Sequence, residues 1–151
     1  MIIFQNEIFI KTSPEKLFRY VTQPWYWHDW HPSSLSAKSD KQTLALGDHF
    51  TEVIKINPLS PLPLSLKRKT QYKVTIHVNA KTWEVKGTLD DGWLIIHYDF
   101  IPKDDGTLFK RKLTIQITGY KKFFLPFLLR RRMEALSVIA MQNLKNKMEK
   151  G

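Results

Sequence analysis

The sequence predicts an α+β protein in which a seven-stranded antiparallel sheet wraps around a long C-terminal helix. Two observations lead to this fold class. Residues 71–118 carry apolar side chains at nearly every second position, which is the period of strands with one buried face. Residues 124–150 instead carry them at helical spacing, over a length of about 40 Å that suffices to cross a whole sheet. One strand and two short helices are expected before the other six strands.

The first elements are predicted from residue type and from capping. Residues 2–10 are rich in Ile and Phe and alternate loosely, as a strand does. A helix should begin after Ser13, because its hydroxyl can accept from an orphan N–H and Pro14 follows where its missing N–H costs nothing. Pro24 ends that helix. A second short helix is expected over residues 24–31, which hold three tryptophans and two histidines.

Beyond this point the pattern becomes sheet-like. We predict strands near residues 34–39, 48–57, 71–79, 82–89, 93–101 and 107–118. Turn residues that tolerate a left-handed backbone separate several of them, at Gly47-Asp48, Asp91-Gly92 and Asp104-Asp105-Gly106. Residues 57–70 depart from the pattern, and their three prolines predict a loop. Alternation places Tyr72, Val74, Ile76 and Val78 on the inner face, and His77 and His97 toward water.

The last segment is predicted to cover the inner face of the sheet as one helix. Pro126 falls in its expected first turn, where proline is tolerated. A stripe at helical spacing should face the sheet, formed by Leu129, Leu136, Ile139, Ala140, Leu144 and Met148.

Composition limits the class of protein. A chain of 151 residues suits one domain, expected over residues 1–151. The absence of cysteine excludes disulfides and thiolate metal sites. The N-terminus shows no signal-peptide pattern, and the longest apolar run, residues 123–129, is too short to span a bilayer. We therefore expect a cytoplasmic protein, with peripheral contact to a membrane as a further expectation.

The order of strand, two helices, six strands and long helix resembles that of a known family. The segments SPEKLFRYVTQPWYWHDWHP, LGDHFTEV, YKVTIHVNAKTWEVKG and the helix end LKNKMEK are similar to the START-like superfamily (SRPBCC) of polyketide cyclases, dehydrases and lipid-transport proteins. The similarity covers nearly the whole chain. It implies the helix-grip fold, with a cavity under the last helix. The superfamily includes carriers, receptors, cyclases and chaperone activators, so the activity stays open.

The interpretation favoured by fold and composition is binding or transport of a hydrophobic small molecule or lipid in that cavity. Apolar burial would supply most of the affinity. No cofactor and no metal site is expected. The residues predicted to line the cavity or its floor are Tyr72, Val74, Trp83, Val85, Leu94, Ile96, Tyr98, Phe109, Arg111, Leu113, Leu136, Ile139 and Ala140.

The alternative is an enzyme of the cyclase or dehydrase type, acting on an aromatic or polyketide-like substrate. Its general base would be His28, His31 or His49, provided that the imidazole faces the cavity and titrates near neutral pH. Asp29 with the first two histidines could also bind a metal, but packing of the neighbouring tryptophans explains this cluster more simply. A third alternative is a ligand-free protein-interaction module, whose own side chains would fill the interior.

Two charged residues are predicted to point inward. Glu52 lies two residues after Phe50, and Arg111 lies two residues from both Phe109 and Leu113. On a strand, residues two apart point to the same face, here the inner one. A buried charge must be paired or change its protonation state. Three alternatives follow: the two residues meet each other, one of them binds a polar group of a ligand, or their strands are bulged.

The net charge of +10 is concentrated in residues 67–69 and 121–132. If the loops at one end of the sheet meet, these cations surround leucines and phenylalanines. Apolar side chains ringed by Lys and Arg suit an anionic membrane, so one hypothesis is a ligand gate that touches a membrane. A solvated or protein-binding end is the alternative. Nucleic acid is less favoured, because the aromatic residues alternate into a covered face. The predicted membrane contacts are Leu62, Leu64, Leu66, Lys67, Arg68, Lys69, Lys121, Lys122, Phe123, Phe124, Arg130 and Arg131.

Overall fold

The computed structural model describes residues 1–56, 66–117 and 121–150 of the chain. Its elements follow one another in the predicted order. They are β1 (Ile2–Ile10), α1 (Pro14–Val21), the 3₁₀ helix η1 (Pro24–Asp29), β2 (Ser34–Lys38), β3 (His49–Ile56), β4 (Leu66–Val78), β5 (Thr82–Leu89), β6 (Gly92–Lys103), β7 (Gly106–Ile117) and α2 (Lys121–Lys150).

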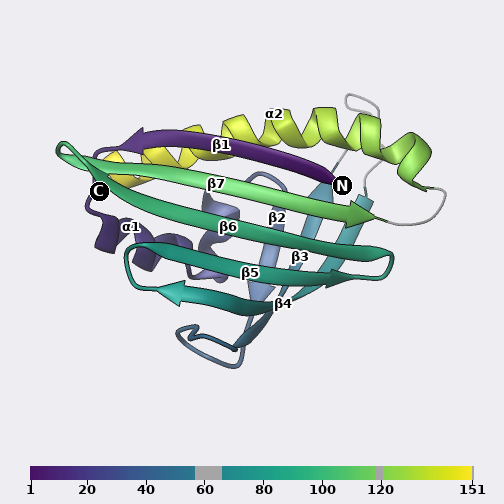
Figure 1. Cartoon of the computed structure of the whole chain (residues 1–151), viewed down its shortest axis with the longest axis horizontal. Coiled ribbons are helices and arrows are strands. Elements are labelled where there is room, and N and C mark those ends of the chain that lie inside the picture. The colour runs from purple at the N-terminus through teal and green to yellow at the C-terminus, as the bar shows by residue number, and fades with distance from the viewer. Residues whose placement is uncertain (57–65, 118–120, 151) are drawn as a thin grey trace.

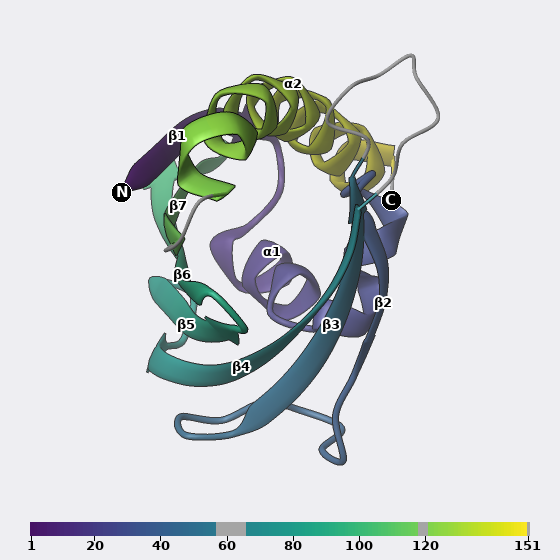
Figure 2. The ribbon, with the colours of Figure 1, turned by 90° about the vertical axis from the view of Figure 1, so that its right-hand side faces the viewer.

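The seven strands form one antiparallel sheet in the order β1-β7-β6-β5-β4-β3-β2. The sheet curls strongly, and α2 runs along β1 across the open side of the curl (Figures 1 and 2). Looking along the curl, α1 lies within it (Figure 2). The α+β helix-grip architecture predicted from the sequence is therefore confirmed. Ser13 caps α1 as expected, its hydroxyl accepting a hydrogen bond from the backbone N–H of Lys16.

The C-terminal half of α2 is fixed to the sheet by polar contacts. The ammonium of Lys145 donates to the carbonyl of Phe9 at 2.7 Å. The Lys11 backbone N–H donates to the Glu149 carboxylate at 2.9 Å, and the Asn143 amide donates to the carbonyl of Trp30 at 3.1 Å. These bonds tie the helix to β1, to the residue that follows β1 and to the end of η1. Over residues 130–150, whose side chains the structure describes, α2 buries Leu136, Ser137, Ala140, Met141, Leu144 and Met148.

Ile139 corrects the predicted helical stripe. Its side chain is 46% exposed, because it lies off the ridge of positions spaced four apart that runs through Leu136, Ala140 and Leu144. It therefore cannot line the interior. The helix also begins at Lys121, three residues before the predicted start.

A β-bulge corrects the inner face predicted for the end of β4. The pairing of β4 with β5 shifts between Val74 and Ile76, so one extra residue enters β4 and the parity reverses. His77 therefore turns inward and meets the ring of Phe18 edge-on at 5.4 Å. Val78, predicted to be buried, is 47% exposed. Inspection of alternation alone cannot reveal such a bulge, because the sequence pattern continues through it.

The predicted loop of residues 57–70 is partly wrong. Residues 66–70 belong to β4 and pair with β3, from Ile56 opposite Leu66 to Glu52 opposite Thr70. The three prolines that predicted the loop all precede residue 66, and Lys67 and Lys69 occupy the solvent side of an ordinary strand. Residues 57–65 lie outside the described part of the chain.

One end of the curl gathers segments that are distant in sequence. The end of β3, the start of β4, the β5–β6 turn, the end of β7 and the start of α2 all lie there (Figures 1 and 2). We refer to it as the α2-start end. The loop residues 57–65 and 118–120, whose meeting at this end was part of the membrane hypothesis, lie outside the described part of the chain.

Candidate functional site

The inner face of the sheet carries a stack of buried aromatic rings. Phe50 stacks on Tyr72 with 4.8 Å between ring centroids, and Trp83 stacks on Tyr98 at 5.5 Å. Phe50 and Trp83 are themselves nearly parallel at 6.4 Å. Trp27 of η1 meets three of these rings edge-on, so the helical layer covers part of the stack. The arrangement forms an extended aromatic wall.

The predicted lining residues, apart from Ile139, are all buried in this interior. Each has less than a tenth of its surface exposed, and they come from β4 to β7 and from α2. They are Tyr72, Val74, Trp83, Val85, Leu94, Ile96, Tyr98, Phe109, Arg111, Leu113, Leu136 and Ala140. Their contact with a ligand stays a prediction.

Glu52 is an acid within the apolar interior. It is 5% exposed and accepts a hydrogen bond from the Tyr72 hydroxyl at 3.2 Å. Burial raises the pKa of Glu52 to about 7, against smaller opposing effects of Ser34, Tyr72 and Arg111. Burial and the neighbouring Glu52 charge also raise the pKa of Tyr72 well above its usual range. At neutral pH the Glu52 carboxyl can therefore both hold and release a proton.

Arg111 is the buried cation of the same interior. It is 6% exposed and lies directly opposite Tyr98 on the neighbouring strand. Its guanidinium donates to the Ser137 hydroxyl at 3.5 Å, while its Nε has no hydrogen-bond partner. Burial raises the pKa of Tyr98 to about 12, an effect that Arg111 partly offsets. Glu52 and Arg111 form no ion pair, so the first of the three alternatives, direct pairing, does not hold. Glu52 contacts Tyr72 instead, and Arg111 contacts Ser137.

Of the three candidate histidines, only His31, which is half-buried, lies close to Arg111 of this interior. Its Nδ1 accepts from the Ser33 backbone N–H and lies 2.8 Å from the Ser33 hydroxyl, which leaves the ring proton on Nε2. Burial, with the nearby charge of Arg111, lowers the pKa of His31 to about 3. His31 is thus a neutral imidazole and a poor base at neutral pH.

His28 and His49 do not face the interior, which corrects their candidacy as general bases. His28 is half exposed and contacts the Asp29 carboxylate at 3.2 Å. His49 is exposed, because its parity is opposite to that of the buried Phe50. Among the described residues, no group of three or more His, Asp and Glu side chains is placed to hold a metal ion.

Several buried polar atoms of the described residues lack a hydrogen-bond partner. Most of them are N–H groups, which can only donate. Such groups are rare in folded proteins unless water or a ligand satisfies them. The atoms are Nε1 of Trp30 and Trp83, Nε of Arg111 and Arg132, the hydroxyl of Thr70, and Nδ1 of His77.

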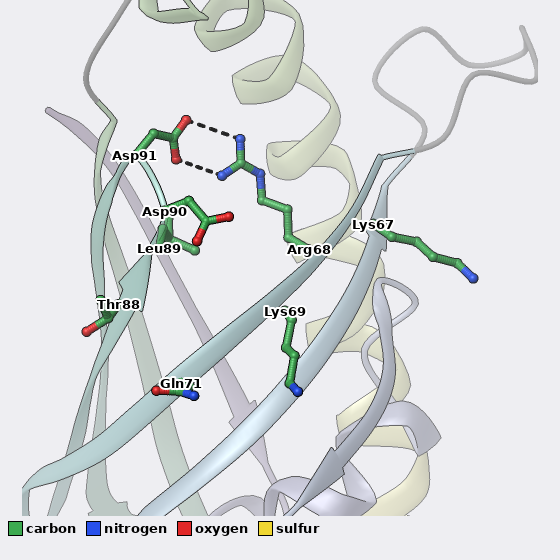
Figure 3. A pocket seen from close by; sticks show the side chains of 8 residues that line it. All are labelled: Lys67, Arg68, Lys69, Gln71, Thr88, Leu89, Asp90 and Asp91. Atoms are coloured by element: carbon green, nitrogen blue, oxygen red, sulfur yellow. Dashed lines mark hydrogen bonds and ion pairs between the residues drawn. The ribbon is translucent and has the colours of Figure 1, made fainter.

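A hollow of about 670 Å³ opens at the α2-start end of the sheet, where β4 runs on past its last pair with β5. Across it the Arg68 guanidinium makes a bidentate ion pair with Asp91 of the β5–β6 turn, at 2.7 and 3.3 Å. Figure 3 shows these two groups facing each other, with Lys67 turned away. Arg68, predicted as a membrane contact, is therefore engaged within the protein.

The other predicted membrane contacts divide into two groups. Lys67, Lys69, Arg130 and Arg131 are exposed, and Arg130 pairs with Glu134 at 3.4 Å. The remainder lie outside the described residues, or have side chains that do: Leu62, Leu64, Leu66, Lys121, Lys122, Phe123 and Phe124.

Sequence reasoning missed the small polar residues of the interior. Thr70 is fully buried and Ser34 and Ser137 are nearly so. Parity with Tyr72 could have identified Thr70, and adjacency to Leu136 on the helix could have identified Ser137. Ser34 gave no such signal, because the short strand β2 has a register shift.

Together these features define a class of protein: a curled antiparallel sheet closed by a C-terminal helix around an aromatic interior that contains an acid, a cation and two tyrosines. Residues 1–149 match the model of the family described as polyketide cyclase / dehydrase and lipid transport. The chain belongs to this family. Membership supports either hydrophobic-ligand binding or a cyclase-type role and does not choose between them.

Solved structures share the fold at low sequence identity. The protein TTHA0849 from Thermus thermophilus is 13% identical with a TM-score of 0.74, and 97% of each chain is covered. A START superfamily protein from Mycobacterium smegmatis is 13% identical with a TM-score of 0.71, over 98% of this chain and 97% of that one.

The di-domain ARO/CYC protein StfQ of the steffimycin biosynthetic pathway is 14% identical with a TM-score of 0.73, over 99% of this chain and 51% of that one. No curated protein sequence matches the chain. Within the described residues, no helix is long and apolar enough to cross a membrane.

Proposed function

We propose that the interior between the sheet and α2 binds a hydrophobic, planar small molecule that carries an oxygen acceptor. The observation that carries this proposal is Arg111, a buried guanidinium whose Nε donor has no partner. A buried donor left without an acceptor destabilises the folded state, and an oxygen of a ligand would satisfy it. A carbonyl, carboxylate or phenolate oxygen fits this role.

The rest of the ligand is indicated by the aromatic wall. The nearly parallel rings of Phe50, Tyr72, Trp83 and Tyr98 offer flat apolar faces. Planar ring systems gain from offset stacking on such faces in addition to the burial of apolar area. An aromatic or polyketide-like molecule therefore suits this interior better than a flexible acyl chain does.

Equilibrium dialysis with two probes of similar shape tests the proposal. The probes are 2-naphthoic acid, which carries a carboxylate, and 2-methylnaphthalene, which does not. A hydrogen bond to a charged group contributes about 1.5–3 kcal/mol, so the acid should bind about 10- to 100-fold more tightly. Arg111→Met should abolish this preference and leave the hydrocarbon affinity unchanged.

Arg130→Met is the matched control, because Arg130 is an exposed arginine that pairs with Glu134 on its own helix. It should keep the preference for the acid. Equal affinity of the unaltered protein for both probes would contradict an anchoring role for Arg111. Binding of neither probe would favour the ligand-free interaction module.

A second candidate function, acid–base catalysis of the cyclase or dehydrase type, is favoured by Glu52. A carboxyl with a pKa of about 7 is suited to proton transfer at neutral pH. The carboxylate would remove a proton from the carbon next to a carbonyl, and the electron pair of that C–H bond would move onto the carbonyl oxygen. Arg111 would stabilise the resulting enolate, and the proton would return to the same carbon.

Exchange of the α-hydrogens of 2-tetralone in deuterated water, followed by proton NMR, distinguishes catalysis from binding alone. Catalysis predicts exchange faster than in buffer, with a rate that rises as Glu52 ionises near pH 7. Glu52→Gln should remove the acceleration while 2-naphthoic acid still binds. No acceleration by the unaltered protein would leave binding as its function.

A further inference from the structure

The outer face of the sheet carries five lysines in register on β3, β4 and β5. Lys55 lies directly opposite Lys67, and Lys73 lies directly opposite Lys86. Lys69 follows Lys67 on the same side of β4, two residues further along. All five side chains are exposed. We call this set the lysine face.

The positive charge of the lysine face is not balanced within the described part of the chain. None of its five ammonium groups forms an ion pair there, whereas Arg68 of the same strand pairs with Asp91. Two acids of the outer face, Glu84 and Asp99, both contact His97 instead. The exposed Asp90 borders the same hollow as Lys67 and Lys69, but it forms no ion pair with them. Like charges directly opposite each other on neighbouring strands weaken a sheet. Two such pairs on one face of the sheet indicate a surface that meets an external anion.

The lysine face begins at the hollow of the α2-start end. Lys67 and Lys69 border this hollow, and the side chain of Lys67 turns away from it (Figure 3). From there to Lys73 the face extends about 20 Å along β4. At its far side the ammonium of Lys86 lies 5.7 Å above the ring of the half-buried Trp93. Tryptophan is common where proteins meet the headgroup layer of a membrane.

We propose that the lysine face docks on the surface of an anionic lipid membrane. A charged bilayer presents dense, laterally mobile negative charge and requires no fixed geometry, which suits flexible lysines. Single-stranded nucleic acid fits less well, because the stacked aromatic rings of this protein lie inside the sheet and the outer Trp93 lies under Lys86. Docking would bring the α2-start end close to the bilayer. If the proposed function holds, a hydrophobic ligand would pass between the bilayer and the interior at this end.

Sedimentation with vesicles tests the docking without any ligand. Vesicles of phosphatidylcholine alone are compared with vesicles that also contain phosphatidylserine, at low and at high salt. The unaltered protein should bind only the anionic vesicles and should be released at high salt, because salt screens exposed charges. A lysine near such a surface contributes about fivefold in affinity, so Lys67→Gln/Lys69→Gln/Lys73→Gln should weaken binding about 100-fold.

The matched control removes the same charge from the opposite end of the molecule. Lys81→Gln/Lys103→Gln/Lys150→Gln alters exposed lysines at the β4–β5 turn, the β6–β7 turn and the end of α2 (Figure 1). The vesicle affinity of this control should fall by less than about fivefold, which is the contribution of a single lysine at the membrane surface. Equal losses in the two triple variants would mean that net charge alone drives binding, and would overturn the proposal.

A further variant separates docking from folding. Lys73→Glu places an acid opposite Lys86, so its melting temperature should rise while binding to anionic vesicles falls. The membrane assignment is wrong if phosphatidylserine does not increase vesicle binding by the unaltered protein. It is also wrong if the protein binds a single-stranded DNA oligonucleotide of equal charge more tightly than the anionic vesicles. Neither result bears on the dialysis with 2-naphthoic acid, so the docking surface and the proposed function can fail independently.

Discussion

At the scale of single residues, the interior holds a buried carboxyl and a buried guanidinium that do not neutralise each other. Glu52 meets Tyr72, and Arg111 meets Tyr98 and Ser137, but the two charges form no ion pair. A buried acid and base that do not pair are costly to the folded state. Their presence is understandable if a ligand or a reaction uses them.

Glu52→Gln is expected to remove a pH dependence of stability. Between the ordinary pKa of 4.5 and the folded value of about 7, the folded protein retains a proton that the unfolded chain releases. The unfolding free energy therefore falls as the pH rises through this window, by at most about 3 kcal/mol. Urea unfolding across this range should show the fall for the unaltered protein relative to the variant.

His31 has the opposite sign and must be distinguished from Glu52. Its pKa is lowered from 6.5 to about 3, so stability rises as the pH climbs between these values. Because Glu52→Gln leaves His31 in place, the difference between the two proteins isolates the carboxyl. Parallel stability curves for both would show that Glu52 titrates normally.

At the scale of elements, α2 illustrates how a helix is fixed by one ridge of side chains. Leu144 is fully buried, whereas Ile139 projects to solvent one turn away. The hydrophobicity of the two residues is similar, so only their direction on the helix separates them. The helix is long enough that this choice of face determines what closes the interior.

Substitution of these two residues by alanine should therefore have different effects. Leu144→Ala should lower the unfolding free energy by about 2–5 kcal/mol, because it leaves a cavity in the packed core. Ile139→Ala should change it by less than about 0.5 kcal/mol, as exposed positions do. Thermal unfolding followed by circular dichroism measures both. A comparable loss for the two variants would contradict the described orientation of α2.

At the scale of the whole molecule, closure of the curl is uneven. The strands β6 and β7 have hydrogen-bonded neighbours on both sides along most of their length. The outer neighbour of β7 is β1, and α2 packs along β1. Residues 66–70 of β4 pair with β3, while their other edge faces the hollow bridged by Arg68 and Asp91. The two regions should differ in local stability.

Amide hydrogen exchange is expected to reveal this difference. The amides of β6 and β7 should exchange most slowly, through opening that approaches global unfolding, whereas residues 66–70 should exchange through local opening. Arg68→Gln should speed exchange in residues 66–70 and leave β6 and β7 unchanged. Uniform protection across β4 would show that the sheet does not open at the hollow.

The sequence predicted most elements because local signals agreed with one another. The Ser13 cap, the alternation of β5 to β7 and the turns at Gly47 and Asp104, both of which have positive φ, could be identified residue by residue. The inward parity of Glu52 and Arg111 was visible in the same way. The bulge after Val74 and the extension of β4 back to Leu66 were not, because no local residue type marks them.

The amino-acid pattern alone thus determined the order of elements, the buried face of most strands and the presence of two inward charges, since these follow from local periodicity. Only the tertiary structure decided which partners those charges meet, which histidine joins them and which face of α2 is buried. It also aligned lysines of three strands on one surface. These outcomes depend on strand register and on the curl of the sheet, which arise from contacts between residues far apart in sequence.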